Sequence, residues 1–264
     1  MAGRAWREYC GRRARRPHAR THLHGETDLP DPAPPSPASV ALVIGFEGGI
    51  GSALVRELEA SERFSRVIGL GRRSNPPLDL LDEASVSAAL GQAASAGELR
   101  LVLHAAGVLH GPGLTPEKSL SRIDPEAMAL AFAVNATGPA LVMKHLAPLL
   151  PRRGRCVFAA LSARVGSIGD NRLGGWYAYR ASKAALNQLV HTAAIELARR
   201  NPEALCVALH PGTVATGLSA PIVGDDDRAQ PPEMAARKLL AVLDALPASA
   251  TGGFFDPEGQ VVPW

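Results

Sequence analysis

Residues 40–51 read VALVIGFEGGIG, a short apolar run that passes directly into a glycine-rich turn. The apolar, β-branched run 40–44 is typical of a buried strand. Apolar side chains then recur at helical spacing, which predicts a helix over 50–60. Glycines at a strand-to-helix junction let the backbone approach a phosphate closely, and the first helical amides then face that phosphate. The stretch therefore predicts a nucleotide-binding turn.

The alternation of strand and helix continues to the end of the chain. The expected strands are continuously apolar, as in a sheet that is covered on both faces. We therefore predict an α/β fold with a single doubly wound parallel sheet (Rossmann fold) and helices on both faces. Further strands are expected over 66–70, 100–104, 155–161 and 204–209, and helices over 83–95 (capped by Asp82), 125–150 (capped by Asp124), 177–200 and 232–246.

The positive charge is concentrated at the N-terminus. The 264 residues carry a net charge of +3, yet residues 1–20 hold seven arginines and one glutamate, so the rest of the chain is net acidic. Residues 29–38 contain five prolines, which is typical of an extended linker. We expect a disordered Arg/Pro-rich extension over 1–38 and one globular domain over 39–264. An organelle presequence and a segment that binds an acidic or nucleic-acid partner are the alternatives for the extension.

Composition excludes several classes of protein. Hydrophobic residues make up 46 % of the chain, which excludes global disorder. The three cysteines, Cys10, Cys156 and Cys206, are too few and too scattered for a disulfide framework or a metal site. No uninterrupted apolar run approaches 18 residues, so no membrane span is expected. We expect a cytoplasmic protein without a metal and without a nucleic-acid partner for its globular part.

Arg72 and Arg73 follow the second expected strand, and no acidic residue occupies 70–74. In a dinucleotide-binding unit an acid at this place binds the ribose 2′-hydroxyl, whereas an arginine accommodates a 2′-phosphate. The pattern favours NADP(H), with NAD(H) as the less favoured cofactor. Two solvated arginines at a strand end are the alternative interpretation.

Tyr179 and Lys183 are four residues apart in the expected helix 177–200, so they share one helix face. An ammonium group beside a phenol stabilises the phenolate and lowers its pKa. The pair could therefore provide an acid or base near neutral pH. Such a pair on a solvated helix face is the alternative.

Taken in order, the motifs resemble those of the short-chain dehydrogenase/reductase family over residues 39–264. Residues 162–189 and 252–264 look closer still to its C-factor-like subgroup. Ile44 and His104-Ala105 depart from the family pattern, and the gap from Ser162 to Tyr179 is longer than usual. The resemblance rests on Gly45-x-x-x-Gly49-Ile50-Gly51, Asp79-Leu80, Ala106-Gly107, Asn135, Ser162, Tyr179-x-x-x-Lys183 and Pro211-Gly212-x-x-x-Thr216.

The resemblance implies roles for four catalytic residues. Tyr179 would protonate the developing alkoxide, and Lys183 would lower the pKa of Tyr179 and hold the nicotinamide ribose. Ser162 would hydrogen-bond the substrate oxygen, with Ser167 as the competing serine, and Asn135 would position a water. The implied cofactor-binding residues are Gly45, Gly49, Ile50, Gly51, Arg72, Asp79, Leu80, Ala106, Gly107, Tyr179, Lys183, Gly212 and Thr216.

The implied function is NADP(H)-dependent interconversion of a small carbonyl compound and its alcohol. The alternative is a C-factor-like signalling protein that binds the dinucleotide with little turnover. Apolar residues over 126–150 and 177–198 lead us to expect a homodimer or homotetramer.

Overall fold

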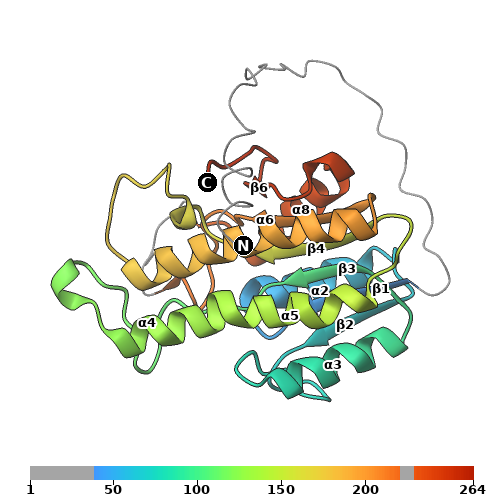
Figure 1. Ribbon diagram of the computed structural model, residues 1–264, viewed down its shortest axis with the longest axis horizontal. Coiled ribbons are helices and arrows are strands. Elements are labelled where there is room, and N and C mark those ends of the chain that lie inside the picture. The colour runs from blue at the N-terminus through green and yellow to red at the C-terminus, as the bar shows by residue number, and fades with distance from the viewer. Residues whose placement is uncertain (1–38, 221–228) are drawn as a thin grey trace, which may run out of the picture. The chain divides into compact units, whose positions relative to one another are not determined.

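The computed structural model describes residues 39–220 and 229–264 (Figure 1). The predicted N-terminal extension over 1–38 lies outside these residues.

Within the described residues, six parallel strands form one sheet in the order β2-β1-β3-β4-β5-β6. The four central strands are almost wholly buried, which explains why their sequences are apolar without alternation. The strands are β1 (Ser39–Ile44), β2 (Arg66–Leu70), β3 (Glu98–His104), β4 (Cys156–Leu161), β5 (Ala204–Leu209) and β6 (Phe254–Phe255).

Helices cover both faces of the sheet (Figure 1). One face carries α3 (Glu83–Ser95), α5 (Gly138–Leu146) and α6 (Tyr177–Arg200), and the other carries α2 (Gly49–Ala60) and α8 (Pro232–Ala245). Each face has its own apolar core, built from alternate residues of the same strands. The predicted doubly wound α/β fold is confirmed.

Two helix starts predicted from the sequence are present as expected. The Asp82 carboxylate accepts a hydrogen bond from the Ala84 amide at the start of α3. The Asp124 carboxylate accepts one from the Ala127 amide at the start of α4 (Pro125–Phe132), which packs against α6. Both carboxylates satisfy amides that the first helical turn leaves unpaired.

The prediction of one continuous α-helix over 125–150 is wrong in detail. After α4, a π-helical turn spans Ala133–Thr137 and leads into α5, and a 3-10 turn over Ala147–Leu149 ends the element. A π-turn inserts an extra residue into the helical ladder and is frequent at functional sites. Here it contains Asn135. The other 3-10 turns span Leu120–Arg122, Arg164–Gly166 and Ala248–Ala250.

The continuous helical stretch Pro125–Leu149 is long and apolar enough to cross a membrane, by length and composition alone. In this fold Val142 and Leu146 of that stretch lie in the core beneath the sheet face. A core helix passes the same test, so the stretch gives little support for a membrane span.

A cleft begins between β1 and β3, where the order of the strands in the sheet reverses. The chain runs from β1 outward to β2 on one side and then returns to β3 on the other. The helices that follow β1 and β3 therefore lie on opposite faces, and a crevice opens at the carboxyl ends of these two strands.

Gly51 and Gly91 provide a matched test of the turn. A Cβ on Gly51 would lie 2.1 Å from the Gly45 carbonyl oxygen, whereas a Cβ on Gly91 in α3 meets nothing within 4 Å. Gly51→Ala should lower the free energy of unfolding by about 1–3 kcal/mol through overpacking. Gly91→Ala should raise it by up to about 1 kcal/mol because alanine favours a helix. Urea denaturation measures both, and equal effects would contradict this account of the turn.

Candidate active site

A cleft of about 810 Å³ opens at the carboxyl ends of β1, β3, β4 and β5. Gly51, Asn135 and Gly212 are predicted site residues that do not line it. The other predicted residues line it together: Gly45, Gly49, Ile50, Arg72, Asp79, Leu80, Ala106, Gly107, Ser162, Tyr179, Lys183 and Thr216.

The glycine turn forms a cradle at the floor of the cleft. Gly45 has φ +84°, and a Cβ there would lie 2.7 Å from the Ala106 backbone nitrogen. A Cβ on Gly49 would lie 2.7 Å from Thr216 Cγ2. No side chain caps α2 at its N-cap residue, Gly48. The first amides of α2 therefore face the cleft unscreened, which suits an anionic pyrophosphate.

The two arginines after β2 differ in their partners. Arg73 pairs with the Glu47 carboxylate, with 3.1 Å between Arg73 Nε and Glu47 Oε1, and its backbone amide donates to the same oxygen. Arg72 also lines the cleft, and it forms no ion pair with any residue in the described part of the chain. Arg72 is therefore the better placed of the two to meet an anionic group in the cleft.

Two further short segments line the cleft, at Asp79-Leu80 and at Ala106-Gly107. Asp79 accepts a hydrogen bond from the Leu81 amide, and Leu80 is buried beside Gly138 at the start of α5. In the other segment, a Cβ on Gly107 would lie 3.2 Å from Asn135 Oδ1 and 3.3 Å from Lys183 Nζ. Gly107 thus leaves space beside the lysine.

Lys183 is buried, with 4 % of its surface exposed. Its ammonium nitrogen donates to the Leu161 carbonyl oxygen at 2.9 Å. Burial lowers the pKa of Lys183 to about 8 because the charged form loses its hydration. An ammonium has three N–H donors, so this group has capacity for hydroxyl oxygens of a ligand in the cleft.

Tyr179 lies beside this lysine, with Lys183 Nζ 5.8 Å from the centre of the phenol ring. Burial raises the pKa of Tyr179 to about 12. Loss of hydration is the cause of this rise, and the expectation that Lys183 lowers the pKa of Tyr179 stays a prediction. A phenol in this state is a proton donor at neutral pH.

The two candidate serines occupy different places. Ser162 lines the cleft at the end of β4, and its hydroxyl donates to Asn187 Oδ1 at 2.6 Å. Ser167 is buried outside the cleft lining, where its hydroxyl oxygen accepts a hydrogen bond from the Asp170 amide. The geometry brings Ser162, and not Ser167, into the same cleft as Tyr179.

Asn135 is buried and does not line the cleft. Its Oδ1 accepts from the Val108 amide and its Nδ2 donates to the Val108 carbonyl, both at 2.8 Å. Nδ2 also donates to Ser182, whose hydroxyl donates to the Tyr179 carbonyl. Asn135 therefore joins the segment after β3 to α6, and its expected role in positioning a water stays a prediction.

Gly51 and Gly212 also act outside the cleft lining. Gly51 allows α2 to approach the Gly45 carbonyl, and a Cβ on Gly212 would lie 2.9 Å from Gln230 Nε2. Both glycines permit close packing of the loops that shape the cleft.

Sequence reasoning missed three buried polar residues, Glu117, Ser182 and Asn187. No local pattern distinguishes them, because each has a hydrogen-bond partner that lies 25 to 61 residues away. His104 was noticed only as a departure from the family pattern. It is fully buried, neither ring nitrogen has a partner among the described residues, and burial lowers its pKa to about 3. It is therefore a neutral group behind the lysine.

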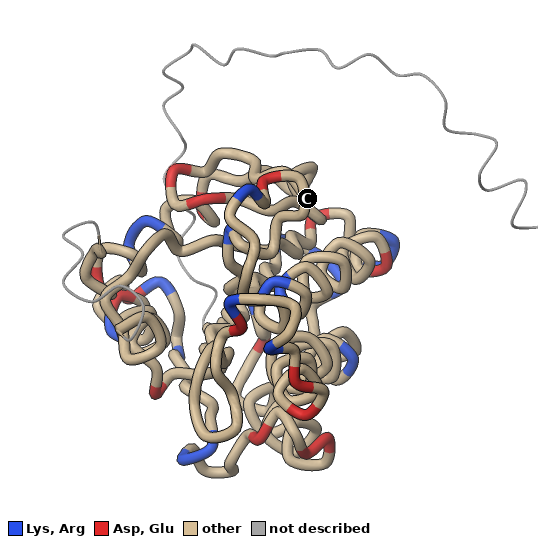
Figure 2. Tube along the Cα trace, turned by 90° about the vertical axis from the view of Figure 1, so that its left-hand side faces the viewer, with Lys and Arg blue, Asp and Glu red and all other residues tan. Residues whose placement is uncertain are grey.

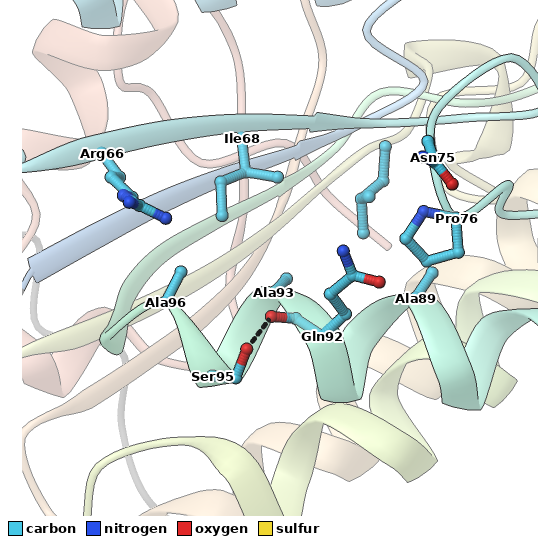
Figure 3. Close-up of a pocket in the computed structure, with 10 residues that line it drawn as sticks. Arg66, Ile68, Asn75, Pro76, Ala89, Gln92, Ala93, Ser95 and Ala96 are labelled. Carbon is cyan, nitrogen blue, oxygen red and sulfur yellow. Dashed lines mark hydrogen bonds between the residues drawn. The ribbon is translucent and has the colours of Figure 1, made fainter.

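A second cavity of about 220 Å³ lies between β2 and α3 (Figure 3). Ile68 and Ala93 contribute apolar surface, and Arg66, Asn75 and Gln92 contribute polar groups. None of the predicted site residues lines it. The residues of 39–220 and 229–264 also contain no group of three or more potential metal-binding side chains.

Comparison with known proteins identifies the class that this cleft defines. The family model described as enoyl-(acyl carrier protein) reductase matches residues 51–240. The chain belongs to the short-chain dehydrogenase/reductase family, which comprises NAD(P)-binding oxidoreductases.

Two curated relatives match over much of their own length. C-signal of Myxococcus xanthus is 38 % identical over 147 residues, which cover 55 % of this chain and 84 % of that protein. The 1-hydroxy-2-glutathionyl-2-methyl-3-butene dehydrogenase of Rhodococcus sp. (strain AD45) is 29 % identical over 238 residues, which cover 86 % of this chain and 100 % of that enzyme.

Among solved structures, the NADPH-bound carbonyl reductase from chicken fatty liver is similar with a TM-score of 0.74 and 26 % identity. The match covers 86 % of this chain and 94 % of that chain. The carbonyl reductase Sniffer of D. melanogaster shares the fold, with a TM-score of 0.73 at 21 % identity, over 86 % of this chain and 99 % of that chain.

The serine assignment can be tested with two alanine variants. Ser162→Ala removes a hydroxyl from the cleft and should lower kcat by on the order of 100-fold, as loss of an oxyanion donor does in other enzymes. Ser167→Ala should leave kcat within about threefold, since that hydroxyl serves a turn. The loss of NAD(P)H absorbance with an accepted substrate measures both. A large loss in Ser167→Ala with none in Ser162→Ala would reverse the assignment.

Burial of Lys183 predicts a dependence of stability on pH. Its pKa falls from an ordinary value of 10.5 to about 8 in the folded protein. Between these values the unfolded chain binds more protons at this residue, so its contribution to the free energy of unfolding rises with pH.

Lys183→Met removes this titrating group. We expect the unfolding free energy of the wild type to rise relative to that of the variant between pH 8 and 10 in chemical denaturation. A difference that stays constant over this window would contradict the burial of a titrating ammonium.

Proposed function

We propose that this protein is an NADP(H)-dependent oxidoreductase that interconverts a carbonyl compound and its alcohol. The observation that carries the proposal is that Ser162, Tyr179 and Lys183 line one cleft with the open amide end of α2. The similarity to the NADPH-bound carbonyl reductase supports the same class of reaction.

The residues of the cleft fit a dinucleotide. The turn from Gly45 to Gly49 and the first amides of α2 would hold the pyrophosphate. Asp79 and Leu80 would lie beside the adenine, and Lys183 would bind ribose hydroxyls. When bound, the nicotinamide supplies or accepts a hydride.

Side chains of the protein would supply the proton that carbonyl reduction requires. With a pKa raised to about 12, Tyr179 stays protonated at neutral pH and is suited to donate its proton to a developing alkoxide. Ser162 lies in the same cleft, and its hydroxyl would turn from Asn187 Oδ1 to donate to the substrate oxygen. Lys183 carries its charge below about pH 8, and this charge stabilises negative charge that forms nearby. These states favour reduction of a carbonyl near neutral pH.

The most direct test of the activity is a panel of aldehydes and ketones incubated with the purified protein and NADPH. We expect loss of absorbance at 340 nm with at least one aldehyde or ketone of the panel. No turnover across the panel, together with measurable NADPH binding, would contradict the enzymatic proposal.

Arg72 should set the choice of cofactor. Arg72→Ala should weaken NADPH binding by about tenfold or more while leaving NADH binding nearly unchanged, since only NADPH carries the 2′-phosphate. Arg73→Ala is the matched control, because Arg73 is already paired with Glu47. Fluorescence titrations of both cofactors measure these effects. Equal losses of NADPH and NADH affinity in Arg72→Ala would count against the assignment.

A second candidate function follows from the similarity to C-signal. In that case the chain would act as a signalling or regulatory protein that binds the dinucleotide with little turnover. The presence of Ser162, Tyr179 and Lys183 in one cleft favours the enzyme. Incubation with the panel of aldehydes and ketones and NADPH separates the two functions, because only an enzyme oxidises the cofactor.

We propose a cytoplasmic homodimer or homotetramer whose described part binds no nucleic acid. Figure 2 supports the last point, since basic and acidic residues are interspersed along the part of the chain that the structure describes. Binding to nucleic acid would require a more continuous basic surface.

A further inference from the structure

The segment that leads into the catalytic helix has an unusual backbone. Gly174, Gly175 and Trp176 have φ values of +63°, +66° and +53°, so three consecutive residues are left-handed. Trp176 is the N-cap of α6, and its side chain does not cap the helix. A left-handed tryptophan is strained, and it persists only where surrounding contacts hold it.

Glu117 supplies those contacts from a distant part of the chain. Only 4 % of its surface is exposed. Both of its carboxylate oxygens lie 3.2 Å from the Ala178 amide, and its backbone carbonyl accepts a hydrogen bond from the Trp176 amide. A negative charge at the N-terminus of a 24-residue helix also interacts favourably with the helix dipole. No described lysine or arginine forms an ion pair with this carboxylate.

These contacts surround Tyr179. Ala178 directly precedes it, and the Trp176 ring meets the Tyr179 ring edge-on, with 6.4 Å between the ring centres. The segment that carries Glu117 also supplies His110 and Leu114 to the lining of the cleft. Glu117 therefore joins one wall of the cleft to the start of the helix that carries the phenol.

We propose that Glu117 is a positioning residue, whose carboxylate fixes the start of α6 and thereby the place of the Tyr179 hydroxyl in the cleft. This inference rests on the proposed function. Glu117 does not line the cleft itself, so it acts through Trp176 and Ala178.

The experiment compares Glu117→Ala and Glu117→Gln in the full-length chain. Glu117→Ala should lower kcat for carbonyl reduction by about tenfold or more while the Kd for NADPH changes less than about twofold. Glu117→Gln keeps an oxygen acceptor for the Ala178 amide and should retain kcat within about threefold of the wild type. A kcat in Glu117→Gln as low as that in Glu117→Ala would overturn the role assigned to this hydrogen bond.

Asp124→Ala is the matched control, because it removes a carboxylate that caps α4 rather than α6. It should lower thermal stability without changing kcat. If Asp124→Ala and Glu117→Ala lower kcat equally, the effect of Glu117 is general destabilisation and the proposal is overturned.

Hydrogen–deuterium exchange provides a readout that does not depend on turnover. Amides of residues 174–180 should exchange faster in Glu117→Ala, and those of 83–95 in α3 should not. Unchanged exchange over 174–180 would overturn the proposal. Absence of carbonyl reduction in the wild type, with faster exchange in the variant, would instead reject the proposed function and keep the structural role of Glu117.

Discussion

The close approach of Gly51 to the carbonyl of Gly45 sets the geometry of the rest of the site. A Cβ at Gly51 would lie 2.1 Å from that oxygen, so no other residue fits without moving the helix. This close approach lets the start of α2 pack against the turn after β1, where Gly48, Gly49 and Ile50 line the cleft and no side chain caps the helix. Because β1 and β3 mark the reversal of strand order, the same crevice receives residues from four strand ends.

In the cleft, burial rather than pairing with charged groups shifts the pKa values of Lys183 and Tyr179. The Lys183 ammonium donates a hydrogen bond to one protein oxygen, the Leu161 carbonyl. Burial of Tyr179 disfavours its phenolate form. Each ionisation that burial opposes raises the free energy of the folded protein when that charge is present. Glu117 is a further buried ionisable residue of this region, and its carboxylate accepts a hydrogen bond from the Ala178 amide. Tyr179 is therefore protonated at neutral pH, and Lys183 is positively charged below about pH 8.

Much of the fold was predictable because its signals are local. The expected elements 66–70, 177–200 and 204–209 agree with β2, α6 and β5 to the residue. The π-turn at Asn135 and the two-residue strand β6 were not predicted, since both depend on tertiary contacts rather than on periodicity. In the site, the motif residues were placed by order along the chain. Glu117 and Asn187 escaped notice because their partners are distant in sequence, and the raised pKa of Tyr179 depends on burial that no spacing reveals.

The central claim is that one phenol delivers the proton for carbonyl reduction in a cleft that also binds NADPH. The most direct measurement is the rate of NADPH oxidation by Tyr179→Phe with an accepted carbonyl substrate, with NADPH affinity measured in the same preparation and Tyr177→Phe as the matched control. We expect Tyr179→Phe to lose nearly all turnover and to keep NADPH binding, and Tyr177→Phe to keep both. Wild-type turnover in Tyr179→Phe would contradict it.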